Sequence, residues 1–316
     1  LNRRGYAGFV SCRSCGEVMK CPHCDVSLSE HKGGRLICHY CGYTQPMPKL
    51  CPKCGSKYIL GFKAGTQQIE EKLKELYPGV RTLRMDADTT RTKDSYEKIL
   101  SSFANGEADV LIGTQMIVKG HDFPKVTLVG ILAADLSLNA SDYRAGERTF
   151  QLLTQAVGRA GRGVLPGEAV IQTYQPDHYA ITCAAAQDYE SFYQEEILYR
   201  ELSGYPPVAH MLAVQIYGKE EENVKQLALR LTDVVKSNMD FLSGKQKEQS
   251  NKKIQVLGPA PANISKINDI YRYVFYVKHA EYDVLVEVKD RLEETLRQWQ
   301  PRQMSIQFDF DPVSVL

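Results

Sequence analysis

The chain has 316 residues, of which 43% are hydrophobic and 24% are charged, a composition typical of globular rather than disordered proteins. No stretch approaches about 18 consecutive apolar residues, which excludes a transmembrane helix, and the first residues lack the apolar segment of a signal peptide. The length fits about two domains, and because the chain does not begin with Met, we expect it to be part of a longer protein.

The net charge of +1 conceals an uneven distribution of charges. Residues 1–60 carry nine Lys and Arg against only Glu17, Asp25 and Glu30, so the remainder of the chain is net acidic. A basic segment of this kind is typical of a surface that binds a polyanion, and we expect nucleic acid as the partner. The alternative is that these are solvated basic residues on a metal-binding module.

Eight of the nine cysteines form four Cys-x-x-Cys pairs: Cys12/Cys15, Cys21/Cys24, Cys38/Cys41 and Cys51/Cys54. Each such turn directs two thiolates at one ion, and two turns complete a tetrahedral zinc site. Disulfides are the less favoured alternative, because no secretory signal is present. The sequence therefore predicts a cysteine-rich module over residues 12–55 that holds two structural zinc ions.

Four pairs can be combined into two sites in three ways. The inner pairs, Cys21/Cys24 and Cys38/Cys41, enclose thirteen residues, which is close to the usual spacing of a zinc ribbon. This spacing favours nested sites, with Cys12/Cys15 and Cys51/Cys54 forming the outer one. Sequential pairing is the second alternative and a cross-braced arrangement is the third.

Beyond the cysteines, short apolar runs alternate with segments of helical periodicity. We expect strands at 58–62, 80–85, 108–113, 126–134 and 169–173. Helices are expected from residue 64 up to Pro78 and over 92–104, 143–157 and 177–202. Strands that alternate with helices of about 10–15 residues predict a mostly parallel, doubly wound α/β sheet.

The sequence Gly204-Tyr205-Pro206-Pro207 is the clearest linker in the chain. Beyond it we expect strands at 211–217, 254–257, 271–278 and 304–310, with helices over 220–238 and 282–298. This βαββαβ order predicts a ferredoxin-like α+β domain over 204–316. The α/β domain then comprises residues 1–11 and 56–203, with the cysteine-rich module inserted.

One loop of the α/β domain, residues 113–124, leaves the C-terminal end of a predicted strand. Open α/β sheets bind ligands at that edge. Thr114, Lys119, Gly120 and Asp122 are residues that can contact phosphate groups and ribose hydroxyls. We therefore expect this loop to take part in nucleotide binding.

A second loop, residues 155–163, follows a predicted helix and has the sequence QAVGRAGRG. Arg159 and Arg162 are three residues apart, which places them on one face of a helix, and the small residues between them allow a ligand to approach. Two guanidinium groups in this arrangement can clamp a triphosphate and stabilise charge during phosphoryl transfer. The alternative is that both arginines only complement the helix dipole.

Together the two loops resemble motifs V and VI of superfamily 2 helicases, whose second RecA-like lobe carries them. The resemblance rests on Ile112-Gly113-Thr114-Gln115-Met116 and on Gln155 to Arg162. With the four cysteine pairs upstream, Arg3-Arg4-Gly5-Tyr6 and Leu257-Gly258-Pro259-Ala260-Pro261, the whole chain is similar to the C-terminal half of the bacterial replication-restart helicases.

The resemblance implies a role for each matching residue. Cys12, Cys15, Cys51 and Cys54 hold one zinc, and Cys21, Cys24, Cys38 and Cys41 hold the other. Arg159 and Arg162 reach across the interface between the lobes to ATP, and Gln155 positions the phosphates or the attacking water. Gly120 and Asp122 lie near the nucleotide, whereas Thr114, Gln115 and Lys119 couple it to the DNA strand.

The resemblance also implies the function of the complete protein. Members of this family are ATP- and Mg²⁺-dependent 3′-to-5′ DNA helicases of the bacterial cytoplasm that recognise stalled or branched replication forks and initiate primosome assembly. The expected partners are forked and single-stranded DNA, single-stranded-DNA-binding protein and other primosome proteins. We expect a monomer without membrane contact.

The sequence contains no G-x-x-x-x-G-K-[ST] motif and no D-E-x-H box, the elements that bind ATP and Mg²⁺ in P-loop motors. We therefore expect this chain alone to hydrolyse no ATP. The alternative function is a zinc-dependent docking module for DNA or primosome proteins that has no motor activity.

Overall fold

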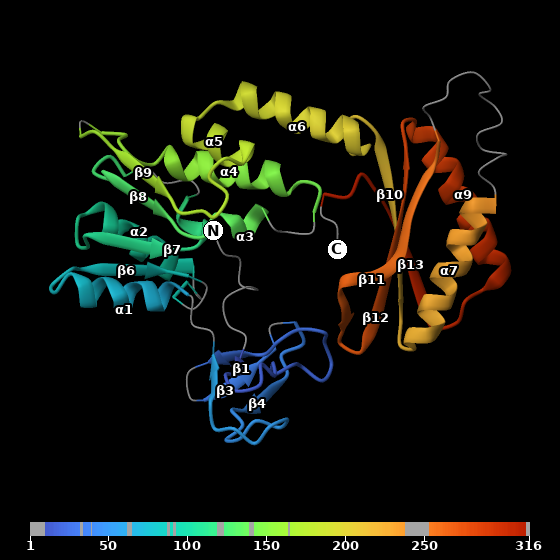
Figure 1. Ribbon diagram of the computed structural model, residues 1–316, viewed down its shortest axis with the longest axis horizontal. Helices are drawn as coiled ribbons and strands as arrows, with labels where there is room; N and C mark the ends of the chain where they lie inside the picture. Colours follow the sequence, from blue (N-terminus) through green and yellow to red (C-terminus); the bar gives the residue numbers. More distant parts are fainter. Residues whose placement is uncertain are drawn as a thin grey trace.

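The computed structural model describes residues 10–31, 34–38, 40–61, 65–86, 89–90, 93–118, 123–138, 142–163, 165–237 and 253–313. The chain forms a small cysteine-rich part, an α/β part and a C-terminal α+β part, which occupy separate regions in Figure 1. Among the described helices, none combines the length and the apolar character needed to cross a bilayer.

The cysteine-rich part is built from strands of three residues. β1 (Val10–Cys12) pairs antiparallel with β5 (Ile59–Gly61), which closes the module at the point where it joins the α/β part. β2 (Ser29–His31), β3 (Arg35–Ile37) and β4 (Thr44–Pro46) form an antiparallel sheet. Five buried cysteines fill much of its interior among the described residues, and the buried apolar side chains beside them are those of Val10, Met19, Leu28, Leu36 and Ile59.

The α/β part contains the parallel strand pairing that the sequence predicts. β6 (Thr82–Met85) pairs in parallel with β7 (Val110–Gly113), and β8 (Leu128–Ile131) with β9 (Glu168–Ile171). The described strands thus form two pairs rather than one continuous sheet. α1 (Thr66–Leu76) and α2 (Lys93–Ala104) pack against the first pair, α4 (Ala145–Val157) packs against β8, and the short α3 (Asp135–Leu138) packs against α4.

The expected helix over 177–202 is wrong in one respect, because it is two helices. α5 (Tyr179–Ala186) ends at Gln187, whose φ of 55° is left-handed. The Asp188 side chain then accepts a hydrogen bond from the Ser191 N–H at 3.0 Å and caps α6 (Tyr189–Ser203). A continuous apolar periodicity concealed this break.

The C-terminal part follows the βαββαβ order. β10 (His210–Gly218), β11 (Gln255–Ile267), β12 (Ile270–His279) and β13 (Met304–Phe310) form an antiparallel sheet in the order β11-β12-β10-β13. α7 (Glu221–Ser237) and α9 (Tyr282–Trp299) lie on the same side of this sheet (Figure 1). Alternate residues of the central strands, with Phe275 fully buried, form the core beneath the two helices.

The expected strand over 254–257 is much longer in the structure. β11 continues through Gly258-Pro259-Ala260-Pro261, with register shifts between Leu257 and Ala260 and between Pro261 and Lys266. It turns into β12 at Asn268 and Asp269, which both have positive φ, as a tight hairpin requires. The sequence suggested a break there because Gly and Pro usually end strands.

Gly113, at the end of β7, illustrates how tightly the parallel pair is packed. A Cβ atom added at this position would lie 2.6 Å from the Met85 carbonyl oxygen and 2.5 Å from the Ile117 side chain. Gly130 in β8 has no atom within 4 Å of the same hypothetical Cβ. Only the first of these two strand glycines is therefore required by close approach of the backbone.

We predict that Gly113→Ala lowers the free energy of unfolding of the α/β part by about 2 kcal/mol, because backbone atoms of β6 must move. Gly130→Ala is the matched control and should change it by less than about 0.5 kcal/mol or stabilise it. Chemical denaturation of the two variants measures both values, and equal stability of the two variants would contradict the close approach.

Candidate functional site

The eight paired cysteines come together as two groups of four. One group contains Cys12, Cys15, Cys51 and Cys54, and the other contains Cys21, Cys24, Cys38 and Cys41. Within each group all four sulfur atoms lie within 4.8 Å of one another. This is the nested arrangement, in which the outer pairs enclose the inner ones.

Sulfur–sulfur distances in both groups suit a tetrahedral zinc ion. Cys12 and Cys54 are 3.6 Å apart, Cys15 and Cys51 are 3.7 Å apart, and Cys21 and Cys41 are 3.5 Å apart. Four thiolates at the usual Zn–S bond length lie about 3.8 Å from one another. The residues present therefore fit two structural zinc ions, and neither group leaves a position for a substrate.

Backbone turns prepare the thiols for metal binding. In three of the four pairs the residue after the second cysteine is a glycine with positive φ: Gly16, Gly42 and Gly55. The N–H of each glycine donates a hydrogen bond to the carbonyl oxygen of the first cysteine of its pair. Burial alone would raise the pKa of Cys12, but hydrogen bonds from the backbone N–H groups of Cys15 and Ser14 and from the Cys54 thiol lower it, whereas the pKa of Cys54 is raised by its contacts with the other thiols of the group. Hydrogen bonds of this kind favour the thiolate, which is the form that binds zinc.

The fourth pair, Cys21/Cys24, is followed by Asp25 and contacts the β11–β12 hairpin. The Asn268 N–H donates to the Cys24 sulfur at 3.4 Å, and the Asp269 N–H donates to the His23 carbonyl at 2.9 Å. The His23 ring is 2.7 Å from the Asp269 carboxylate. The inner cysteine group is thus joined directly to the C-terminal part.

Two further contacts extend this joint. The Asp25 N–H donates to the Lys266 carbonyl at 2.9 Å, and the Lys266 ammonium donates to the Pro22 carbonyl at 3.0 Å. The Ser265 hydroxyl donates to the Asp25 carboxylate at 2.9 Å. Because several of these acceptors are backbone atoms of the metal-binding turn, the contact depends on the shape of that turn.

The second predicted site, around the two arginines, follows α4. This helix ends at Val157, so Arg159 and Arg162 lie in the turn after it, and their expected placement on one helical face is wrong. The Arg159 guanidinium donates to the Val118 carbonyl at 2.6 Å, and the Arg162 guanidinium donates to the Gly158 carbonyl at 2.6 Å. The turn is therefore stabilised by its own arginines.

The glycines of this turn lie close to neighbouring backbone. A Cβ atom on Gly161 would lie 2.7 Å from the Gly167 nitrogen, and one on Gly163 would lie 2.1 Å from the Pro124 carbonyl oxygen. Both glycines permit neighbouring backbone to pack against the turn. Close packing of the backbone therefore requires small residues at both positions, and the approach of a ligand to the arginines stays a prediction.

The two predicted loops meet at Arg159. Val118 is the last residue of a 3₁₀ helix, η1 (Gln115–Val118), that follows β7 and Thr114. Thr114 and Gln115 are half-buried in this segment, whereas Gln155 is exposed on α4. The predicted residues Lys119, Gly120 and Asp122 lie outside the described residues.

Asp135, which follows β8, is a buried carboxylate; from the sequence, a position facing the interlobe cleft and a role in a turn are equally favoured. Burial alone would raise its pKa, but hydrogen bonds from the Thr173 hydroxyl at 2.7 Å and the Tyr174 N–H at 3.1 Å hold that pKa below its ordinary value. Asp135 therefore joins the segment after β8 to the segment after β9. Its contacts are structural.

A second cluster of buried charges, around Glu147 and Arg200, lies at the start of α4. Sequence reasoning missed it. The only sequence signal is the four-residue spacing of Glu196 and Arg200 on α6, which is common on exposed helices and does not reveal burial.

Comparison with known protein families now defines the class of the chain. Residues 50–164 match the helicase conserved C-terminal domain, and residues 21–46 match the PriA DNA helicase Cys-rich region domain. Residues 201–313 match the primosomal protein N C-terminal domain. The three matches identify a chain with a PriA-type cysteine-rich region, a helicase conserved C-terminal domain and a primosomal protein N C-terminal domain.

Curated relatives identify the family. The chain is 43% identical over its whole length to replication restart protein PriA of Bacillus subtilis and 40% identical to that of Synechocystis. It is 34% identical, over 96% of its length, to that of Haemophilus influenzae. The chain belongs to the family of replication restart protein PriA, which confirms the resemblance, and it spans 37–39% of the length of these three relatives.

We predict that loss of the inner metal site releases the β11–β12 hairpin. Hydrogen exchange of the Asp25, Asn268 and Asp269 amides should accelerate in Cys41→Ser, because the turn that they contact loses its shape. Cys54→Ser, in the outer group, is the matched control and should leave these amides protected. Equal exchange in both variants would show that the contact does not depend on the inner metal site.

Proposed function

We propose that this chain is part of an ATP-dependent 3′-to-5′ DNA helicase that recognises stalled or branched replication forks and initiates primosome assembly. The observation that carries the proposal is the meeting of the two predicted nucleotide loops at Arg159 and Val118. Family membership and the match to the helicase conserved C-terminal domain support it.

We also propose a domain assignment for the three parts of the chain. Residues 1–11 and 56–203 form the second RecA-like lobe, residues 12–55 the two-zinc insert, and residues 204–316 a ferredoxin-like domain. Parallel pairing in β6–β7 and β8–β9 supports the first assignment, and the strand order β11-β12-β10-β13 supports the last.

In this proposal ATP binds between the present lobe and a first lobe that lies outside the chain. Arg159 and Arg162 extend toward the γ-phosphate, and Gln155, exposed one turn earlier on α4, orients the phosphates or the water. Mg²⁺ supplies charge neutralisation when it is bound with ATP. Thr114, Gln115 and Lys119 connect the nucleotide to the DNA strand, and Gly120 and Asp122 line its site.

The geometry of the Arg159 contact indicates how the lobe can respond to nucleotide. Its guanidinium is half-buried and rests on the carbonyl that ends η1. A phosphate that draws this guanidinium toward the lobe interface therefore acts at the same time on the strand-end loop. Arginine is suited to this because its planar group carries several donors in fixed directions.

We further propose forked and single-stranded DNA, single-stranded-DNA-binding protein and primosome proteins as partners of a monomeric protein in the bacterial cytoplasm. The basic character of residues 1–60 supports contact with DNA. A docking module without motor activity is the second candidate. The contact between the inner cysteine group and the β11–β12 hairpin favours it, because it makes a zinc-dependent composite surface.

We predict that Arg159→Ala in the full-length protein lowers DNA-dependent ATP turnover at least about a hundredfold, because a group that stabilises transferring phosphate is lost. DNA affinity should change less than about twofold. Arg81→Ala is the control, since Arg81 forms an exposed ion pair with Asp109 elsewhere on the same lobe. Turnover measured by phosphate release should be unaffected in the control and undetectable for the chain alone.

Unchanged turnover in Arg159→Ala would remove the proposed role of this arginine and favour the docking module. Arg159→Lys separates charge from geometry, because lysine keeps the charge and loses the planar fork. The ATP turnover of Arg159→Lys should be close to that of Arg159→Ala and well below that of the unmodified protein.

A further inference from the structure

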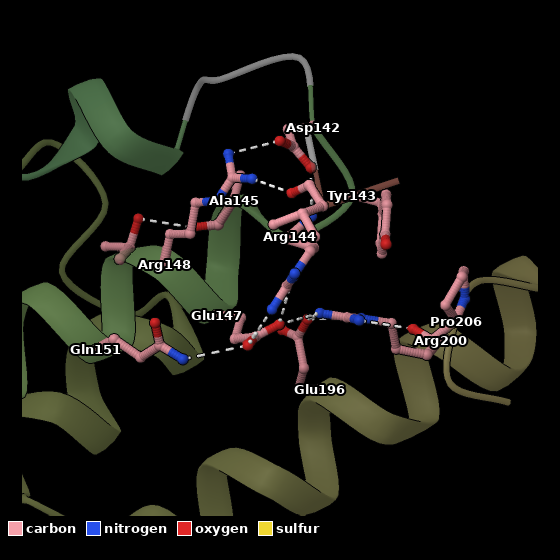
Figure 2. Close-up of polar contacts among 12 residues, drawn as sticks. Asp142, Tyr143, Arg144, Ala145, Glu147, Arg148, Gln151, Glu196, Arg200 and Pro206 are labelled. Atoms are coloured by element: carbon pink, nitrogen blue, oxygen red, sulfur yellow. Dashed lines mark hydrogen bonds and ion pairs between the residues drawn. The ribbon is translucent and has the colours of Figure 1, made fainter. Parts of the chain in front are cut away.

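α4 leads into the turn that contains Arg159 and Arg162, which we call the arginine turn. The other end of this helix contacts the C-terminal part of the chain. α4 has 13 residues, which gives it a length of about 20 Å. Arg159 follows its C-terminal end, and the cluster in Figure 2 surrounds its N-terminal end. Any displacement of one end of so short a helix is transmitted to the other.

Glu147, in the first turn of α4, accepts hydrogen bonds from two arginines. The Arg144 guanidinium donates to both of its carboxylate oxygens, at 3.0 and 2.9 Å, and Arg200 donates to one of them at 2.9 Å (Figure 2). The hydrogen bond from Arg144 is the main reason that the pKa of Glu147 lies below its ordinary value. The carboxylate is thus ionised and held from both sides.

Arg200 joins α4 to the segment that enters the C-terminal part. Its side chain, on α6, also pairs with Glu196 and donates to the Pro206 carbonyl at 2.6 Å. Only 5% of Arg200 and 7% of Glu196 are exposed. Buried charges of this kind tolerate few alternative arrangements, because an unpaired one is costly.

The C-terminal part also reaches the start of α4 through the segment after β13. The Tyr143 hydroxyl donates to the Pro312 carbonyl at 3.0 Å. Arg148 pairs with Asp142 at 2.6 Å and donates to the Val313 carbonyl. Pro312 and Val313, which are remote in sequence, therefore hold the start of α4.

The predicted linker at 204–207 is part of this joint. The Tyr205 ring stacks on Tyr143 with centroids 5.0 Å apart, and Pro206 is buried. Lys278 of β12 lies 3.5 Å from the centre of the Tyr205 ring and donates to the Ser203 carbonyl at 2.8 Å. The segment marks a boundary between folds, but it is packed on both sides and does not form a flexible hinge.

We propose that α4 is a rigid strut through which the C-terminal part sets the position of the arginine turn, with Glu147 and Arg200 as positioning residues. This inference rests on the proposed function of Arg159. Binding of DNA or protein to the C-terminal part then changes the nucleotide site by shifting the start of α4. The ionic cluster fixes one arrangement of the two parts, and the Tyr143 and Arg148 contacts fix the same arrangement independently.

The first test measures hydrogen exchange in this chain without nucleotide. The Arg159 and Gly161 amides donate to the Ala156 and Val126 carbonyls, at the far end of α4. Their exchange should accelerate at least about fivefold in Glu147→Gln and in the double variant Tyr143→Phe/Arg148→Gln. Arg81→Gln, which lies outside the joint, should leave it unchanged. If exchange accelerated only at residues 143–150, the proposal that α4 acts as a rigid strut would be overturned.

The second test separates positioning from general stability in the full-length protein. Glu147→Gln should lower ATP turnover several-fold in the otherwise unmodified protein and have no further effect in an Arg159→Ala background, because it acts through that arginine. Equal losses in both backgrounds would overturn the positioning role. If Arg159→Ala itself has no effect, the proposed function fails, and the exchange measurement still decides whether α4 is a strut.

Discussion

The four-sulfur group formed by the inner cysteine pairs is the interaction on which the arrangement of this chain depends. The part that contains it has strands of three residues and few buried apolar side chains, so hydrophobic burial alone gives it little stability. Its turn at Cys21–Cys24 presents the Pro22 and His23 carbonyls and a sulfur atom to the β11–β12 hairpin. A metal-binding turn therefore provides the docking surface for residues some 240 positions later in the chain.

A second joint connects the same C-terminal part to the α/β part. Here the contacts are buried ion pairs and aromatic rings around Glu147, Arg200 and Tyr143. The C-terminal part is consequently held at two places, one organised by cysteines and one by charges. Neither joint contains the arginine turn. The second joint, however, lies at the N-terminal end of α4, and the arginine turn follows the C-terminal end of the same helix. This arrangement links the three regions that the comparisons describe separately.

The sequence predicted the elements whose cause is local. Cysteine spacing favoured the nested grouping, and alternating apolar runs located the parallel strands and the βαββαβ order. It did not predict the length of β11, because its Gly and Pro residues normally end a strand, nor the break at Gln187 within an apolar periodicity. It could not predict the ionic cluster, because Glu147 and Arg200 are 53 residues apart and only the fold brings them together. The roles of Gln155, Thr114 and Gln115 stay predictions.

The proposal that this protein recognises forked DNA, and that the zinc-dependent surface of this chain takes part in it, is tested most directly by a binding titration. The chain is titrated by fluorescence anisotropy against forked, single-stranded and plain duplex DNA, before and after zinc removal and at several salt concentrations. We predict tighter binding to the fork that is lost without zinc, with a steep salt dependence from phosphate contacts. Weak binding that is indifferent to DNA structure and to zinc would contradict it.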